Sequence, residues 1–294
     1  MTDNVNKSRR NLLIGTSAVL NTYNPLRDRF RPVFHQGIDI GFINQIYESS
    51  ENTILICAQS GLYRLNQNKL EQLTRNLPAI AISEYKKDVF WLANNQQLLM
   101  INREGEVIKE YPEFRKSASE ALSTSNNIST IYKDRQGEIW IGTKRNGLYQ
   151  YNFDQDLFDP VIPPHRNNPL EVNMVRAVSE DHSGNLWIGT ESGLFIYNKT
   201  SGNFSYYNQS FDKSPHTLND KAIYTLFRSA ENIMWIGTYF GGINFVKPKD
   251  KGFHKIMPDG GRISLNGKAI SQIIGDNQEN LWVDYGNDNK GGTL

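Results

Sequence analysis

The side chains of this sequence that are able to do chemistry are polar and aromatic residues placed between apolar runs. Three short segments stand out: Lys144-Arg145-Asn146, Glu191-Ser192 and Tyr239-Phe240. Aromatic rings stack on the faces of sugar rings, while Arg, Asn and Glu side chains form paired hydrogen bonds with hydroxyl groups. This combination predicts a binding surface for an oligosaccharide. For each residue taken singly, an ordinary solvated turn is the alternative interpretation.

Further polar residues lie in the longer segments that connect one apolar group to the next. The predicted ligand-binding residues are then Lys144, Arg145, Asn146, Glu191, Tyr239, Phe240, His165, Arg166 and His216. Asn167 and Asn219 accompany them. These residues differ from one part of the chain to the next, as expected for a surface that binds an asymmetric ligand.

Catalytic and metal-binding patterns are absent from the sequence. The five histidines show no HExxH or other metal-ligand spacing, and there is no GxSxG, Walker or GxGxxG motif. Asp134, Asp181 and Asp276 recur at one position of a repeat, where capping of a turn explains them better than calcium binding. We therefore predict no catalytic residue, no metal site and no cofactor.

Composition narrows the class of protein. The 294 residues include 32 basic and 31 acidic side chains, without long blocks of one sign, which argues against direct contact with nucleic acid and, for the chain as a whole, with a membrane surface. No run reaches the roughly 18 to 20 apolar residues of a membrane-spanning helix. The single cysteine, Cys57, excludes a disulfide framework and occupies a repeat position where other copies have glycine, so we expect it to be buried.

The elements that must position the polar segments belong to a repeat. "IWIGT", "LWIGT" and "MWIGT" place Trp140, Trp187 and Trp235 at intervals of 47 and 48 residues. The complete set of repeat anchors is Leu13, Leu55, Trp91, Trp140, Trp187, Trp235 and Trp282. Intervals of 36 to 49 residues match the length of a four-stranded propeller blade.

One copy shows the expected layout of a blade. Its predicted strands are 175–181, 185–190, 194–198 and 203–208, joined by short turns rich in Gly, Ser and Asp. In such a blade, the turn between the second and third strands lies at the same end as the connection to the next blade. The polar segments described above all fall at that end.

The sequence thus predicts an all-β fold, a β-propeller of four-stranded blades with seven repeats. We expect incomplete terminal blades, because few residues precede Leu13 and twelve follow Trp282. Residues 1–10 are interpreted as a leader or the remnant of an upstream strand. Residues 11–294 are interpreted as a single propeller domain and a fragment of a longer sensor.

A family resemblance rests on three of these copies. "DRQGEIWIGTKRNGLYQYN", "DHSGNLWIGTESGLFIYN" and "ENIMWIGTYFGGINF" resemble two-component regulator propeller repeats, as do lead-ins such as "LEVNMVRAV" and "LNDKAIYTL". The resemblance is strong from about Leu122 to Trp282 and continues in register back to Leu13.

What the resemblance implies is a role in sensing. Such propellers form the periplasmic input portion of hybrid two-component systems in Bacteroidetes, where they detect glycan fragments and control polysaccharide-utilisation genes. A second propeller, an Ig-like domain and a histidine kinase are then expected partners in the full-length chain, which is expected to form a homodimer. The chain itself would not be an enzyme.

Two other functions stay open at this point. A propeller lyase would use His165 and His216 together with a metal held by carboxylates. A protein-docking scaffold would use the same end of the blades without a small ligand.

The segment "KSRRNLLIGTSAVLNTYN" has two interpretations. Two arginines before a short apolar run resemble a twin-arginine export signal. The repeat explains Leu13, Gly15-Thr16 and Asn24 together at the spacing found elsewhere. We favour the repeat, so that a periplasmic location follows from the family resemblance alone.

Overall fold

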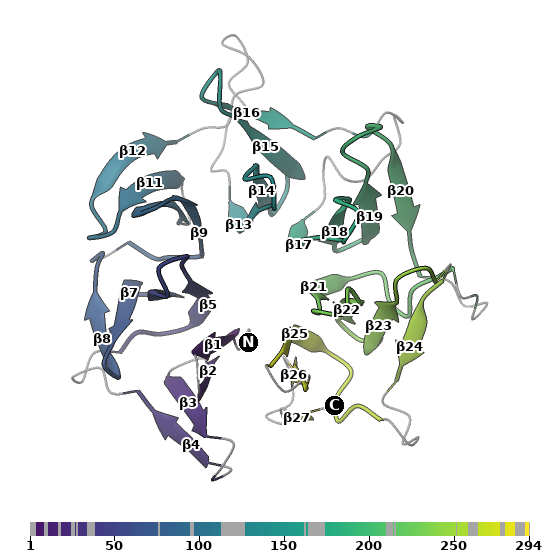
Figure 1. Ribbon diagram of the computed structural model, residues 1–294, viewed down its shortest axis with the longest axis horizontal. Helices are drawn as coiled ribbons and strands as arrows, with labels where there is room; N and C mark the ends of the chain where they lie inside the picture. The colour runs from purple at the N-terminus through teal and green to yellow at the C-terminus, as the bar shows by residue number, and fades with distance from the viewer. Residues whose placement is uncertain are drawn as a thin grey trace. The chain divides into compact units, whose positions relative to one another are not determined.

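The computed structural model consists of β-strands joined by turns and short connections (Figure 1). It describes residues 4–8, 11–16, 19–24, 27, 29–33, 39–75, 77–94, 97–112, 127–161, 163, 174–209, 214, 216–250, 252–257, 264–276, 280–285 and 292–293. The described residues contain no helix with the length and apolar character that crossing a bilayer requires. Contacts divide the chain into unit 1, residues 1–141 with 149–160, and unit 2, residues 142–148 with 161–294.

Unit 1 contains three complete sheets and most of a fourth. The first consists of β1 (Asn4–Ser8), β2 (Asn11–Gly15), β3 (Leu20–Asn24) and β4 (Arg29–Pro32). The second consists of β5 (Ile43–Glu48), β6 (Ile54–Ala58), β7 (Gly61–Asn66) and β8 (Lys69–Gln72). The third consists of β9 (Ala81–Lys86), β10 (Val89–Ala93), β11 (Leu98–Asn102) and β12 (Val107–Tyr111). The fourth consists of β13 (Ile128–Lys133), β14 (Ile139–Thr143), β15 (Leu148–Asn152) and β16 (Leu157–Pro160).

Unit 2 contains the remaining three sheets. The first of these consists of β17 (Val175–Glu180), β18 (Leu186–Thr190), β19 (Gly193–Tyr197) and β20 (Phe204–Tyr207). The next consists of β21 (Ile223–Arg228), β22 (Met234–Thr238), β23 (Ile243–Val246) and β24 (His254–Ile256). The last consists of β25 (Ile270–Gly275), β26 (Leu281–Tyr285) and β27 (Gly292–Thr293).

In every sheet the strands follow one another in chain order. The fold is therefore an all-β propeller with four-stranded antiparallel blades. Six of the seven predicted repeats form four-stranded blades, and the last forms a three-stranded sheet among the described residues. An incomplete first blade was a wrong expectation, because β1 pairs with β2 from Asn4↔Gly15 to Ser8↔Asn11. The division into a leader, residues 1–10, and one domain, residues 11–294, stays a prediction.

All seven predicted anchors lie on the second strand of their sheet. Leu13 is on β2, Leu55 on β6, and the five tryptophans on β10, β14, β18, β22 and β26. The predicted strands of the copy at 175–208 agree with β17 to β20 within one or two residues at each end. "LLIG" accordingly lies on β2, as the repeat interpretation of the N-terminal segment requires.

A glycine two residues after the anchor, present in four of the seven repeats, lets the next sheet approach closely. A Cβ atom added to Gly189 would lie 2.6 Å from Ile223, and one added to Gly237 would lie 2.6 Å from Ile270. Both isoleucines open the innermost strand of the following sheet and are fully buried. Cys57 holds the same position in β6 and is buried beside Ala79 and Ile82, as expected, and burial raises the pKa of its thiol.

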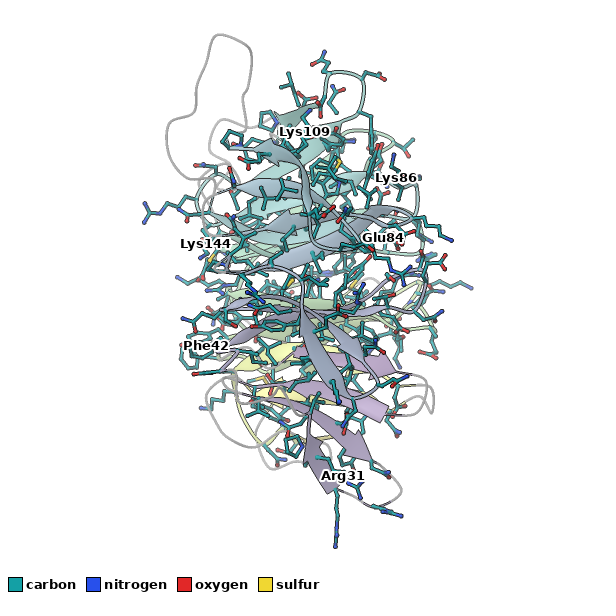
Figure 2. All side chains as sticks on the ribbon, turned by 90° about the vertical axis from the view of Figure 1, so that its left-hand side faces the viewer. Arg31, Phe42, Glu84, Lys86, Lys109 and Lys144 are labelled. Carbon is teal, nitrogen blue, oxygen red and sulfur yellow. The ribbon has the colours of Figure 1, made fainter. Side chains whose placement is uncertain are left out.

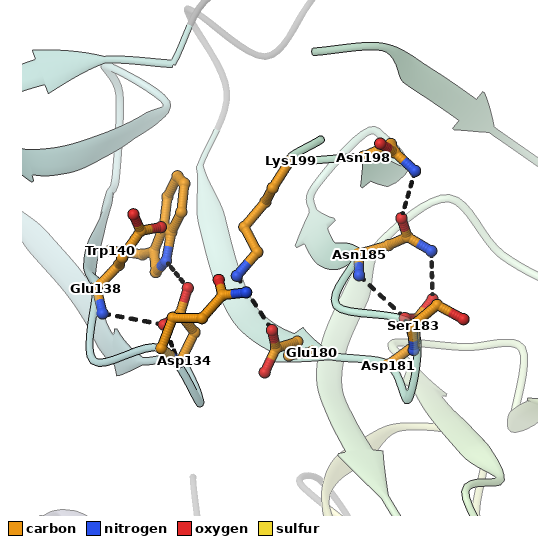
Figure 3. Close-up of polar contacts among 10 residues, drawn as sticks. Asp134, Glu138, Trp140, Glu180, Asp181, Ser183, Asn185, Asn198 and Lys199 are labelled. Atoms are coloured by element: carbon orange, nitrogen blue, oxygen red, sulfur yellow. Dashed lines mark hydrogen bonds and ion pairs between the residues drawn. The ribbon is translucent and has the colours of Figure 1, made fainter. Parts of the chain in front are cut away.

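A second repeated device fixes the turn between the first two strands of a sheet (Figure 3). The Asp181 carboxylate accepts hydrogen bonds from the backbone N–H groups of Ser183 and Asn185, at 2.8 and 3.0 Å, and from the Trp187 indole N–H at 3.0 Å. The indole N–H groups of Trp140 and Trp282 donate in the same way to Asp134 and Asp276. The prediction that these aspartates cap turns is confirmed.

The apolar core of unit 1 is rich in aromatic rings. Trp91 packs between Tyr111 and Tyr151 at centroid distances of 5.1 and 4.9 Å. Both tyrosine hydroxyls donate to the Asp156 carboxylate, at 2.7 and 2.6 Å. Burial raises the pKa of Tyr111. These rings hold neighbouring sheets together and are not available to a ligand.

Candidate ligand-binding site

The pairing register is irregular at the start of the innermost strand in both complete sheets of unit 2. In β17 the register passes from Val175↔Thr190 to Ala177↔Gly189, so that Arg176 has no partner residue on β18. In β21 it passes from Ile223↔Thr238 to Thr225↔Gly237, which leaves Tyr224 in the same position. A β-bulge of this kind bends the strand and redirects one side chain. Arg176 and Tyr224 are thus presented at the end of the sheet where the polar segments lie.

The polar segments are fixed at the same end by equivalent backbone hydrogen bonds. The N–H of Glu191, which follows β18, donates to the carbonyl oxygen of Met174, just before β17. The backbone N–H of Tyr239, which follows β22, donates to the carbonyl oxygen of Ala222, just before β21. Each bond places the turn residue beside the bulged residue of its own sheet.

Arg176 links the two sheets through its guanidinium group. The Nε and Nη2 atoms both donate to Glu191 Oε1, the first at 2.7 Å. The guanidinium carbon also lies 3.9 Å from the centroid of the Tyr224 ring, which is a cation–π geometry. With one carboxylate oxygen and one ring face engaged, the Arg176 side chain is held in place while it stays 23% exposed.

The aromatic part of the site continues from Tyr224. Its ring stacks on Tyr239 at a centroid distance of 4.9 Å and an interplanar angle of 12°. The Tyr239 ring in turn contacts the Phe240 ring at a centroid distance of 4.0 Å, and Phe240 is 58% exposed. Burial raises the pKa of the Tyr224 hydroxyl, an effect that the Arg176 cation opposes.

A carboxylate fixes the exposed end of this row. Asp220 Oδ2 accepts the backbone N–H of Phe240 at 2.7 Å. Glu191, Arg176, Tyr224, Tyr239 and Phe240 thus form one continuous row of contacts, which we call the Arg176–Phe240 row. It offers charged hydrogen-bonding groups at one end and an exposed ring at the other.

A third bulge repeats the arrangement on β25. The register passes from Ile270↔Tyr285 to Gln272↔Asp284, and Ser271 is the residue left over. The Ser271 hydroxyl donates to the carboxylate of Asp284. Strands β21 and β25 lie against each other, so a third polar group follows Arg176 and Tyr224 at the equivalent position.

The structure brings together three of the nine predicted residues, namely Glu191, Tyr239 and Phe240. Lys144 and Arg145 are exposed on the turn between β14 and β15, and the Asn146 N–H donates to Thr143 Oγ1 at 2.9 Å. No contact between described residues joins these three to the Arg176–Phe240 row. His216 is exposed, and its backbone N–H donates to Ser214 Oγ. His165 and Arg166 lie outside the described residues.

Sequence reasoning missed Arg176, Tyr224 and Ser271. A signal for them existed, because each is the second residue of the innermost strand, directly after a fully buried Val175, Ile223 or Ile270. In a regular strand the side chain at this position would face a neighbouring sheet. The bulge leaves the residue without a partner on the next strand and redirects its side chain.

Metal chemistry finds no support in the part of the chain that the structure describes. Within it, no three His, Cys, Asp or Glu side chains are grouped so as to hold a metal ion. The lyase alternative depends on His165, whose position is not described, and on His216, which has no acidic partner among the described residues.

Comparison with known proteins identifies two of the repeats. A family model described as "Two component regulator propeller" matches residues 123–145 and 169–192. A curated relative, Histidine kinase P4 of Formosa agariphila, is 27% identical over 241 residues, which are 80% of this chain and 15% of the relative.

Solved structures share the fold. Two are extracellular domains of putative hybrid two-component systems from B. thetaiotaomicron, each 19% identical, with TM-scores of 0.76 and 0.77. They align with 95% and 99% of this chain, which covers 36% and 39% of theirs. Virginiamycin B lyase from Staphylococcus aureus, at 13% identity, has a TM-score of 0.70, with 97% of this chain and 91% of the lyase aligned.

The repeats at residues 123–145 and 169–192 are therefore two-component regulator propeller repeats, as the sequence indicated. The chain spans about one seventh of the curated relative and less than two fifths of the similar sensor domains.

Proposed function

We propose that this chain is a ligand-sensing input domain of a two-component system and that it binds an oligosaccharide through the Arg176–Phe240 row. The observation that carries the proposal is the continuity of this row, in which a fixed guanidinium–carboxylate pair adjoins a stack of rings with an exposed end. Sugars present hydroxyl groups at their edges and apolar C–H surfaces on their faces, and the row complements both.

The side chains of the row are held in fixed positions before any ligand binds. Arg176 is held by Glu191 and by Tyr224, and Tyr239 is held by stacking and by its backbone bond to Ala222. Preorganised side chains lose less conformational entropy on binding, which raises affinity for a given contact area. The bulges thus serve the site by holding its central residues in a fixed direction.

The signalling part of the proposal rests on the repeat family and on the curated relative, which is a histidine kinase. We propose that kinase and further propeller and Ig-like domains belong to the full-length protein, that it dimerises, and that this domain lies in the periplasm. In this proposal the chain receives the signal and carries no catalytic residue. No observation in unit 2 favours the lyase or the docking scaffold over this function.

A binding screen followed by calorimetry tests the proposal. The purified chain is screened against neutral and acidic oligosaccharides, and the affinity for each ligand found is measured for the wild type, Arg176→Ala and Tyr239→Ala. Each substitution is expected to weaken binding at least tenfold, since it removes a hydrogen-bonding cation or a stacking ring.

Phe204→Ala is the matched control. Phe204 stacks on Tyr197 at 4.5 Å in β19 and β20, at the opposite end of the same sheet from Glu191. The control is expected to bind as the wild type does. Equal affinities of the wild type, Arg176→Ala and Tyr239→Ala, or an absence of binding to any oligosaccharide, would contradict the proposal.

A further inference from the structure

The outermost strand of the first sheet differs from the other outermost strands. All four residues of β4, Arg29-Phe30-Arg31-Pro32, are exposed, and β4 carries two arginines without an acidic residue. Its counterparts β8, β12 and β16 each contain a Glu or an Asp, and β20 contains no charged residue. Strand β24 contains His254 and Lys255 without an acidic residue, but His254 contacts Asp250 in the turn before it. Arg27, in the turn before β4, is exposed as well. Arg27, Arg29, Phe30 and Arg31 are called the β4 edge below.

These arginines lack the ion pairs that three other arginines of the protein form. Arg64, Arg103 and Arg176 each pair with a carboxylate within 4.0 Å. No described carboxylate pairs with Arg27, Arg29 or Arg31; Asp28, the acidic residue between the first two, lies outside the described residues. Figure 2 shows Arg31 pointing away from the ribbon. The β4 edge therefore presents positive charge that the described structure does not compensate.

The aromatic ring of the β4 edge lies on the other face of the strand. Phe30 is 59% exposed, the highest value among the exposed large apolar side chains. It pairs with Tyr23 on β3, at a centroid distance of 4.9 Å. Because successive residues of a strand point to opposite faces, Arg29 and Arg31 flank the edge on one side and Phe30 with Tyr23 on the other.

The backbone of β4 does not favour addition of another strand. Val33 N–H donates to Leu20, and the alternation of an antiparallel pair then directs the N–H groups of Arg31 and Arg29 toward β3. Positions 30 and 32 face outward, and Pro32 has no N–H to donate. A proline and charged side chains are the usual protection of an edge against strand pairing. What the edge offers to a partner is its side chains.

We propose that the β4 edge binds the surface of an anionic lipid membrane. A planar partner that meets the strand edge-on contacts the arginines on one side and the ring on the other, whereas a linear polymer following one face contacts only one of the two. Arginine guanidinium groups bind lipid phosphates, and an aromatic ring enters the adjoining interfacial layer. The binding is weak and reversible, because one ring and three cations bury little apolar surface.

Vesicle co-sedimentation at low salt tests this inference. The chain is mixed with vesicles of phosphatidylcholine alone or with phosphatidylglycerol added at about 30%, a strongly anionic surface. The wild type is expected to bind the anionic vesicles, to lose binding at high salt, and not to bind phosphatidylcholine alone. The double variant Arg29→Gln/Arg31→Gln is expected to bind about 30-fold more weakly, from about 1 kcal/mol for each cation. Phe30→Ser is expected to bind about tenfold more weakly.

Matched variants on other exposed positions serve as controls. Lys69→Gln/Lys221→Gln removes two exposed cations, and Ile108→Ser removes an exposed apolar side chain from β12. All substituted residues are exposed, and circular dichroism verifies that each variant is folded. The controls are expected to bind within twofold of the wild type. Absence of binding to anionic vesicles, or equal loss in the controls, would overturn the inference, as would binding to soluble dextran sulfate without binding to vesicles.

Discussion

The two ends of the sheets in unit 2 are built in contrasting ways. At one end, the turn between the first and second strands repeats the same hydrogen bonds, with Asp181 and Asp276 accepting from turn N–H groups and from a tryptophan. At the other end, equivalent positions hold different residues, Glu191 in one sheet and Tyr239 in the next. The repeated end maintains the fold, whereas the residues at the other end differ from sheet to sheet.

Within the repeated end, one sheet departs from the rule. Ser229 stands in the sheet of β21–β24 where Asp181 stands in the sheet of β17–β20, six residues before the tryptophan in each case. Ser229 Oγ accepts the N–H of Ile233, but the buried indole N–H of Trp235 has no partner among the described residues. Ser229 thus replaces the hydrogen bond that Asp181 accepts from the turn backbone, but it does not replace the one that Asp181 accepts from the tryptophan indole.

The largest effect is expected from removing a buried cap. Asp134 is 5% exposed and accepts hydrogen bonds from the N–H groups of Gln136 and Glu138 and from Trp140. Asp134→Ala is expected to lower the free energy of unfolding by about 3 kcal/mol, since hydrogen bonds to a charged acceptor are lost and buried donors are left unpaired. Urea denaturation measures the change. A loss below about 1 kcal/mol would show that the cap is dispensable.

A smaller effect is expected from filling the space between two sheets. Gly189→Ala places a methyl group 2.6 Å from Ile223 and is expected to destabilise the protein by about 2 kcal/mol through overpacking. Adding Ile223→Ala, which removes the Cγ2 methyl group that lies 2.6 Å from the new Cβ, is expected to give a double variant that loses less stability than the sum of the two single variants. Thermal denaturation compares the double variant with both single variants, and losses that simply add would contradict the packing explanation.

At the variable end, the row and the turn after β14 are expected to differ in their effect on ligand affinity. For an oligosaccharide found in the screen, Arg176→Ala is expected to weaken binding at least tenfold, about 1.4 kcal/mol. Arg145→Ala is expected to change it less than threefold, because Arg145 is exposed and no described contact joins it to the row. Calorimetry on the two variants decides between them. A larger loss for Arg145→Ala would place the ligand on the β14–β15 turn instead.

The smallest effect is a gain of stability in the sheet that lacks the aspartate. Ser229→Asp combined with Glu231→Ser is expected to stabilise the protein by about 1 kcal/mol, because the new carboxylate reaches the orphan Trp235 N–H. Glu231 is replaced since its carboxylate, whose pKa the Ser229 hydroxyl lowers, would repel the new charge. Glu231→Ser alone is the control. Urea denaturation of the two variants measures the gain, and equal stabilities would contradict the role assigned to the carboxylate.

The repeat made most of the fold predictable. Seven anchors at blade spacing located the second strand of every sheet, because a large apolar side chain fills the space between two sheets and a small residue, Gly, Ala or Cys, stands two positions later in six of the seven repeats. The strand β1 was not anticipated, since "NVNKS" lacks the apolar pattern of other innermost strands and is defined by its pairing with β2.

The candidate site was predictable only in part. Glu191, Tyr239 and Phe240 stood out because they interrupt a repeated motif. Arg176 and Tyr224 lie inside strands, and their exposure depends on a bulge, which is a register property that single residues do not reveal. Lys144 and Arg145 were chosen by the same reasoning as Glu191, yet the structure gives them no contact with the row.

Hydrogen–deuterium exchange with and without a bound oligosaccharide tests the central claim most directly, because it reports both ends of the sheets at once. We predict that the ligand slows exchange at residues 174–177, 190–193, 222–225 and 238–241, which surround the Arg176–Phe240 row, and leaves exchange in the capped turns, at 181–185, 276 and 280, unchanged. Protection confined to the capped turns, or equal at both ends, would contradict it.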